Sequence, residues 1–106
     1  MPFVKACESS EIADGRSKAV EVGGKKIAVF RFNEKLYAID DTCTHDEASL
    51  ADGTIIEENG TCVVECPWHG AHFDLCSGAA VTLPAVTPVT AYAVREAGGA
   101  IEVEVA

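Results

Sequence analysis

The sequence predicts an all-β domain, a small antiparallel β-sandwich or barrel. Three observations predict this fold class: short stretches of alternating apolar and polar residues, turn-forming pairs between them, and no segment with a long helical period. Alternation with a period of two places every second side chain on one face of a strand, as in residues 101–105. Because 106 residues suffice for one domain with one core, we expect residues 1–106 to form a single domain.

The predicted strands are short and closely spaced along the chain. They cover residues 2–6, 18–22, 25–32, 35–39, 61–65, 71–74, 90–95 and 100–105. Tight hairpin turns are predicted at four residue pairs, Gly23-Gly24, Asn33-Glu34, Asn59-Gly60 and Gly98-Gly99. These turns favour a meander of antiparallel strands.

Three segments depart from this strand pattern. Residues 9–15 predict one helical turn, with Ser9 at its start and Asp14-Gly15 at its end, and little other helix is expected. Pro84 and Pro88 predict a stiff loop, because proline has no N–H to donate in a sheet. Residues 40–84 hold all three histidines and four of the five cysteines, so we expect an insert there that carries the functional site.

The composition limits the classes of partner. Seventeen acidic and eight basic residues give a net charge of −9, which disfavours nucleic acid and anionic lipid and favours proteins with a basic patch. The acid excess also fits a second interpretation, in which it serves solubility alone. No apolar run approaches the roughly 20 residues that cross a bilayer, and residues 1–5 do not resemble a secretory signal. We therefore expect a cytoplasmic protein that does not contact membranes.

Two short motifs combine a thiol with an imidazole. Cys43-Thr44-His45 and Cys66-Pro67-Trp68-His69 are separated by the twenty residues 46–65. An odd number of cysteines rules out a complete set of internal disulfides, and clustered Cys and His in a cytosolic chain indicate a metal. Two sulfur and two nitrogen ligands fit either zinc or an iron–sulfur centre, so both remain open at this point.

The two motifs resemble the two cluster-binding loops of the Rieske iron–sulfur family. Further positions that match the small ferredoxins of ring-hydroxylating dioxygenases are Ser49 to Gly53, Phe73-Asp74, Gly78 and the Pro84 segment. The resemblance covers essentially the full chain. It implies the Rieske fold, in which the insert of about 40–84 forms a cluster-binding subdomain of two loops.

The resemblance also implies one [2Fe-2S] cluster per chain and its ligands. Cys43 and Cys66 would bind one iron, and His45 and His69 would bind the other. The respiratory branch of the family has an additional cysteine in each loop, where this chain has Ala48 and Trp68. That branch also places hydroxyl groups near the cluster sulfurs, where this chain has Ala71 and Phe73, so we expect a low-potential centre.

The remaining candidates have more ordinary interpretations. His72 is expected at the surface or beside the ligands, and Trp68 is expected to shield the cluster from water. Cys7, Cys62 and Cys76 are expected to be small buried apolar side chains. A cluster bound by four cysteines, at positions 43, 62, 66 and 76, is disfavoured because it would leave both motif histidines without a role. Gly53, Gly70 and Gly78 are expected to serve turns.

The inventory of residues also indicates what the chain does not do. After His45 and His69 only His72 is left, too few histidines for the two-histidine, one-carboxylate iron centre of an oxygenase. No Gly-x-Gly-x-x-Gly motif indicates a nicotinamide or flavin site. We therefore expect the chain to be a one-electron carrier and not an enzyme.

The resemblance implies the two proteins between which this carrier moves. It would take electrons from a flavin-dependent NAD(P)H reductase and pass them to a terminal ring-hydroxylating oxygenase in aromatic compound degradation, through transient contacts. The alternatives are a Rieske subunit of another oxidoreductase or monooxygenase, and a zinc-binding interaction module.

Overall fold

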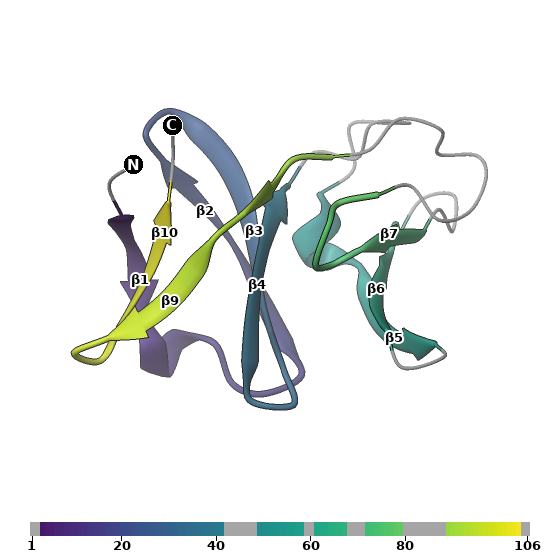
Figure 1. The fold of residues 1–106 in the computed structure, drawn as a ribbon, viewed down its shortest axis with the longest axis horizontal. Coiled ribbons are helices and arrows are strands. Elements are labelled where there is room, and N and C mark those ends of the chain that lie inside the picture. Colours follow the sequence, from purple (N-terminus) through teal and green to yellow (C-terminus); the bar gives the residue numbers. More distant parts are fainter. Residues whose placement is uncertain (1–2, 42–48, 59–60, 68–71, 80–88, 105–106) are drawn as a thin grey trace.

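The strands of the described residues form three antiparallel sheets. The computed structural model describes residues 3–41, 49–58, 61–67, 72–79 and 89–104 (Figure 1). The first sheet has the order β1-β10-β9, the second β2-β3-β4-β8, and the third β5-β6-β7. Their bounds are β1 Phe3–Glu8, β2 Arg16–Val22, β3 Lys25–Phe32, β4 Lys35–Asp40, β5 Thr54–Glu58, β6 Thr61–Glu65, β7 His72–Asp74, β8 Ala91–Tyr92, β9 Val94–Ala97 and β10 Ala100–Glu104. The all-β prediction is confirmed.

Three of the four predicted hairpin turns connect neighbouring strands as expected. Both central residues of each turn have a positive φ, which gives the turn a twist that matches the strands it joins. Gly23-Gly24 and Gly98-Gly99 have φ values of 58° and 80°, and Asn33 and Glu34 have 52° and 65°. The fourth predicted turn, Asn59-Gly60, lies outside the described residues.

The prediction of a meander of antiparallel strands was only partly correct. β2, β3 and β4 follow one another, as do β5, β6 and β7, but β1 pairs with β10 from the other end of the chain. The single strand predicted at 90–95 is two strands, because the chain changes sheets at Ala93: β8 pairs with β4, and β9 pairs with β10. β5, which pairs with β6 along its whole length, was not predicted.

Two short 3₁₀ helices interrupt the strands, and the first begins at Ser9, as predicted, but ends at Glu11, before the predicted end at Asp14-Gly15. The first, η1 (Ser9–Glu11), is preceded by Glu8, whose backbone N–H donates to the Glu11 carboxylate at 2.7 Å, so an acidic pair caps it in place of Ser9. The second, η2 (Leu50–Asp52), was not predicted and follows Ser49. The described residues contain no helix long and apolar enough to span a bilayer.

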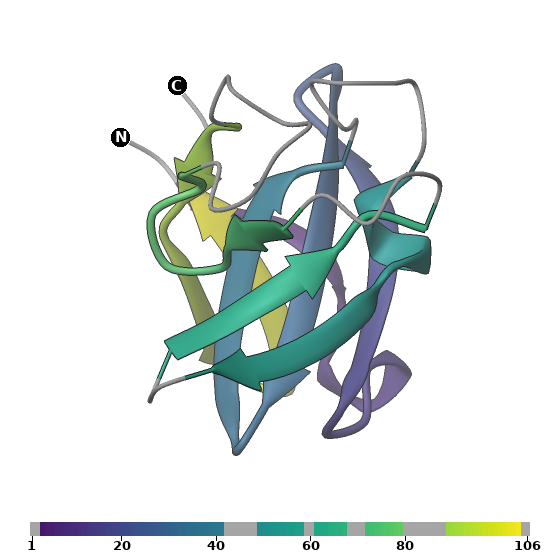
Figure 2. The same ribbon diagram turned by 90° about the vertical axis from the view of Figure 1, so that its right-hand side faces the viewer.

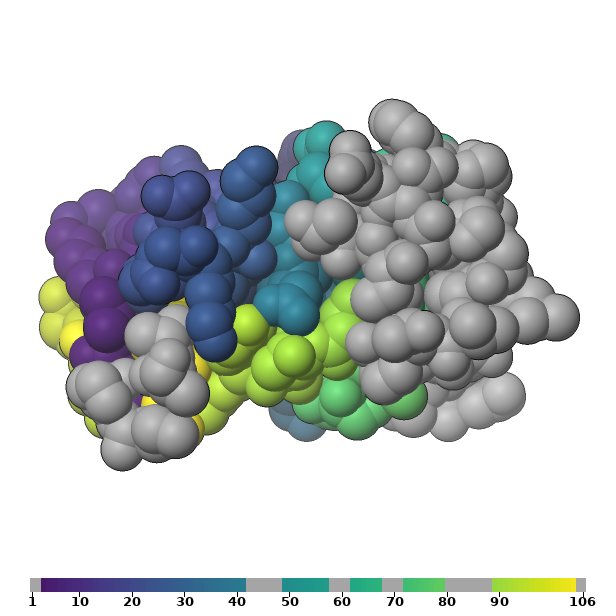
Figure 3. All heavy atoms as spheres, turned by 90° about the horizontal axis from the view of Figure 1, so that it is seen from above, coloured from purple at the N-terminus to yellow at the C-terminus, as the bar shows by residue number. Residues whose placement is uncertain are grey.

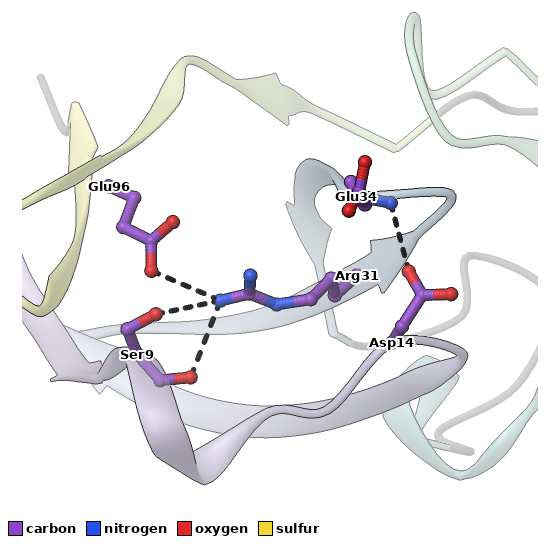
Figure 4. Close-up of polar contacts among 5 residues, drawn as sticks. All are labelled: Ser9, Asp14, Arg31, Glu34 and Glu96. Atoms are coloured by element: carbon purple, nitrogen blue, oxygen red, sulfur yellow. Dashed lines mark hydrogen bonds and ion pairs between the residues drawn. The ribbon is translucent and has the colours of Figure 1, made fainter.

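Arg31 connects three elements at one end of the first two sheets. Its Nη2 donates to the Ser9 hydroxyl at 2.9 Å and to the Ser9 carbonyl at 3.3 Å, and lies 3.5 Å from the Glu96 carboxylate (Figure 4). Nearby, the backbone N–H of Glu34 donates to Asp14 at 2.9 Å. These contacts link η1, β3 and β9, so they stabilise the part of the fold that lies away from the motifs.

Two hydrophobic cores lie on either side of the second sheet. The inner core joins the first two sheets, with Ile27, Val29 and Ile101 among its buried members. The outer core joins the second sheet to the third, whose strands cross in front of β3 and β4 in Figure 2. Its buried members are Ala28, Phe30, Ile39, Leu50, Val64, Cys66, Phe73, Leu75 and Val89. The third sheet is therefore packed directly onto the second.

Candidate metal centre

Cys66 is the one predicted ligand among the described residues. It follows β6 directly, is 1% exposed, and is a free thiol. Cys43, His45 and His69 lie outside the described residues, as do Ala48, Trp68, Gly70, Ala71 and the Pro84–Pro88 segment. Within the described ranges no group of three or more His, Cys, Asp or Glu side chains gathers as in a metal site.

The outer core gathers the flanks of both motifs around Cys66. Ile39 and Leu50 lie on either side of the segment 42–48, which carries Cys43 and His45. Phe73 follows the segment that carries His69, and Val89 follows the segment 80–88. Residues that are distant in sequence therefore pack in one core with a predicted ligand, which is how the fold brings the ends of the two motif segments together.

The ends of the first segment are held by a buried carboxylate. Asp41 is 6% exposed and accepts hydrogen bonds from the Ser49 hydroxyl at 2.7 Å and from the Ala51 N–H at 3.0 Å. Its carbonyl accepts the Leu50 N–H at 2.6 Å. Asp41 precedes residues 42–48 and Ser49 follows them. Asp41 was not predicted as a site residue, because its partner Ser49 is not apparent from the sequence.

The ends of the second segment are held by strand pairing. Glu65 and His72 are opposite each other in the β6–β7 ladder, and their side chains meet with His72 Nε2 3.1 Å from Glu65 Oε2. The His72 side chain is 16% exposed. His72 is therefore partly buried and lies against Glu65, and its position beside the ligands stays a prediction because His69 lies outside the described residues.

A third contact set holds the chain where it returns from residues 80–88. The Val89 N–H donates to the Gly78 carbonyl at 2.8 Å. Asp40 accepts the Thr90 N–H at 3.0 Å and the Tyr92 hydroxyl at 2.6 Å. Burial of the Tyr92 hydroxyl and its hydrogen bond to Asp40 raise the pKa of Tyr92 to about 12, so this hydrogen bond persists across the physiological pH range.

The other cysteines differ from one another in exposure. Cys7 is buried, as predicted, and its burial raises the pKa of its thiol. Cys62 is half-buried and packs against the outer core. The prediction that Cys76 is buried was wrong: it is exposed because it lies in the turn after β7, where its N–H donates to the Asp74 carboxylate at 2.8 Å.

An open hollow of about 580 Å³ lies between the β2–β3 turn and the ends of β4 and β8. Seen from above, the blue β2–β3 hairpin lies beside the lime segment around β8 (Figure 3). The hollow is lined by Gly24, Lys25, Lys26, Asp40, Thr90 and Tyr92. The Asp40 carboxylate already accepts two internal hydrogen bonds, and Lys25 and Lys26 are exposed. The described lining therefore holds no enclosed set of catalytic groups.

Comparison with known proteins defines the class. Residues 2–93 match the family model described as the Rieske [2Fe-2S] domain, and the chain therefore belongs to the Rieske family. Its cofactor is the Rieske [2Fe-2S] cluster, which removes the zinc alternative.

The similar proteins within this family include ferredoxins of dioxygenase systems. The chain is 36% identical to the "3-phenylpropionate/cinnamic acid dioxygenase ferredoxin subunit" of Escherichia coli over 98% of this chain and 94% of that protein. It shares 35% identity with the solved ferredoxin of carbazole 1,9a-dioxygenase from Nocardioides aromaticivorans, which covers 97% of each chain with a TM-score of 0.87. A solved complex of reduced oxygenase and oxidised ferredoxin in carbazole 1,9a-dioxygenase contains a chain that is 36% identical, with a TM-score of 0.80 and coverage of 95% and 91%.

The described part of the site fits a cluster of this kind. Cys66 offers a thiol from inside an apolar core, and the chain supplies the second cysteine and two histidines that mixed ligation requires. Apolar surroundings would exclude water from a cluster bound to Cys66, and packing in the outer core fixes this thiol in position. Cys66 and its surroundings are therefore compatible with an iron–sulfur cluster.

Proposed function

We propose that this chain is the ferredoxin component of a ring-hydroxylating dioxygenase system in aromatic compound degradation, an electron carrier rather than an enzyme. The proposal depends on the similarity to dioxygenase ferredoxins along nearly the full length of the chain, at 36% identity. It is also supported by the outer core, which surrounds Cys66.

We propose that the four ligands are Cys43, Cys66, His45 and His69, with the thiolates on one iron and the imidazoles on the other. When bound, the cluster takes up and releases one electron. The chain's own residues position it: Cys66 is fixed by the outer core, and the ends of both motif segments are fixed by the contacts of Asp41 and of the Glu65–His72 pair.

The proposed partners are a terminal oxygenase and a flavin-dependent NAD(P)H reductase. The oxygenase is supported by the solved complex of a similar ferredoxin with an oxygenase. The reductase is proposed from the resemblance to dioxygenase ferredoxins, and it is consistent with a sequence that carries no Gly-x-Gly-x-x-Gly motif for a nicotinamide or flavin. We also propose that residues 1–106 form one domain with its cluster-binding insert at about 40–84, located in the cytoplasm.

The test of this proposal is the spectrum and the metal content of the purified chain. We expect equal amounts of iron and acid-labile sulfide, a visible absorption that dithionite bleaches, and the electron paramagnetic resonance signal of mixed Cys/His ligation in the reduced form. His45→Cys should lower the midpoint potential or lose the cluster, whereas His72→Ala should retain it. Turnover reconstituted with an aromatic-ring oxygenase and a reductase supports the dioxygenase assignment, and transfer only to another class of oxidoreductase contradicts it.

The midpoint potential should lie near the lower end of the Rieske range of about −150 to +300 mV. The reason is that Phe73, fully buried in the same core as Cys66, brings no hydroxyl that could donate to a cluster sulfur. Phe73→Tyr should raise the potential, and Phe30→Tyr, also fully buried but on the opposite sheet, should raise it less. A wild-type midpoint well above zero in a voltammetric titration would contradict this expectation.

Reduction by the reductase should slow as salt rises. Charges in water lose most of their interaction beyond a Debye length of about 10 Å at 0.1 M salt. If acidic residues of this chain attract a basic patch on the reductase, added salt weakens that attraction. Asp52→Asn, in η2 beside the first motif, should slow reduction at low salt, whereas Glu21→Gln, exposed on β2, should not. Both variants remove one negative charge, so equal effects in stopped-flow kinetics would indicate that only the net charge matters.

A further inference from the structure

Asp41 is the one polar or charged residue that is buried among the described residues. It lies between the end of β4 and the segment that carries Cys43 and His45. Burial of a carboxylate is costly unless donors replace the lost water. Here the Ser49 hydroxyl lies 2.7 and 2.9 Å from its two oxygens, and the Ala51 N–H donates at 3.0 Å. No Lys or Arg of the described residues forms an ion pair with it.

The donors of Asp41 come from the far end of the motif segment. Ser49 and Ala51 follow residues 42–48, so each of these hydrogen bonds joins the two ends of that segment. The backbone adds a bond from the Leu50 N–H to the Asp41 carbonyl, and the Asp41 N–H donates to the Lys26 carbonyl at 3.0 Å. Asp41 and residues 49–51 are therefore joined to one another, and we call this junction the neck of the segment. It is anchored to β3 through Lys26 and continues into η2.

The two motif segments are closed in different ways. The β6–β7 ladder continues to the Glu65–His72 pair, so backbone pairing itself fixes the ends of the second segment. β4 ends at Asp40, and η2 begins only at Leu50, so the first segment has no such ladder at its ends. Its two ends are joined by one backbone hydrogen bond, from the Leu50 N–H to the Asp41 carbonyl, and by the hydrogen bonds that the Asp41 carboxylate accepts.

We propose that Asp41 is a positioning residue for the cluster: through Ser49 and Ala51 it fixes the separation of the chain ends that carry Cys43 and His45. The inference rests on the proposed ligand set. Loss of the carboxylate leaves the Ala51 N–H and the Ser49 hydroxyl without their buried acceptor, and the neck opens. The two ligands of the first segment then lose their common geometry, while the fold, held by both cores, persists.

The test compares iron release from the reduced, cluster-bearing chain to a coloured iron(II) chelator. Asp41→Ala should speed release about 10- to 100-fold, the usual effect of removing a group that orients metal ligands. Ser49→Ala should speed it less, and Asp41→Asn should restore most of the wild-type rate because its amide oxygen still accepts a hydrogen bond. Asp41→Ala should also broaden or shift the electron paramagnetic resonance signal, which a change in global stability would not do.

Ser17→Ala is the matched control. The Ser17 hydroxyl donates to the Ala51 carbonyl at 2.6 Å, so this variant also removes a hydroxyl contact with η2, but the contact comes from β2 and does not join the ends of the segment. Release at the wild-type rate from Asp41→Ala, or equally fast release from Ser17→Ala, would overturn the inference and leave the proposed function standing. A wild-type chain without inorganic sulfide would overturn both.

Discussion

Cys66→Ser should yield a folded protein that retains no [2Fe-2S] cluster. Serine has nearly the volume of cysteine, so the outer core around residue 66 stays filled, but a hydroxyl is a poor ligand for iron at neutral pH. Burial of that hydroxyl without a partner costs about 1–3 kcal/mol of the free energy of unfolding, a loss the two cores can absorb. The measurement is iron and sulfide per chain, together with the visible spectrum and circular dichroism of the strands.

Cys76→Ser is the control for this experiment. Cys76 lies ten residues further along the chain, at the exposed turn after β7, and is also a free thiol. Its replacement should leave iron content, spectrum and stability at the wild-type level. Retention of a full cluster by Cys66→Ser, or loss of it in Cys76→Ser, would mean that the ligand set proposed for this chain is wrong.

Gly78→Ala should lower the free energy of unfolding by about 2–5 kcal/mol. Gly78 has a φ of +78°, where an L side chain costs about 1–2 kcal/mol. A Cβ at this position would also collide with the backbone carbonyl of Val89, and overpacking of this kind costs typically about 1–3 kcal/mol. The same collision breaks the hydrogen bond from the Val89 N–H to the Gly78 carbonyl, which holds the return from residues 80–88.

Gly99→Ala separates the two causes. Gly99 has a φ of +80°, almost the value at Gly78, but a Cβ there would meet nothing within 4 Å. Chemical denaturation should therefore show a loss of about 1–2 kcal/mol for Gly99→Ala, from backbone strain alone. Equal losses for the two variants would show that the contact with Val89 contributes nothing.

Local pattern predicted much of the fold, and the misses share a cause. The strands at 25–32 and 61–65 were predicted at their observed bounds because each is a continuous run between turn signals. The partner of β1 could not be predicted, because pairing with β10 depends on the tertiary fold and not on any adjacent turn. The division of 90–95 at Ala93 was missed for the same reason: the chain keeps an extended pattern there while its pairing partner changes.

For the site, the sequence predicts the ligand types, two thiols and two imidazoles, but not the residues that hold the ligand-bearing segments in place. The Cys43–His45 and Cys66–His69 motifs indicate mixed ligation on their own. Asp41 could not be singled out, because one Asp among seventeen acidic residues has no visible partner until the fold brings Ser49 to it. Cys76 was predicted to be buried because free cysteines are usually buried, but its position in the turn after β7 exposes it.

The pairing of β1 with β10 has a practical consequence. Phe3 and Glu104 are opposite each other in that ladder, so the first and last described residues lie side by side, in the sheet that shares no core with Cys66 (Figure 1). A linker attached next to Phe3 or next to Glu104 would leave from the same end of this sheet. The molecule should therefore tolerate tethering to an electrode or fusion to a reductase at this end, while the part of the fold around Cys66 stays open to a partner.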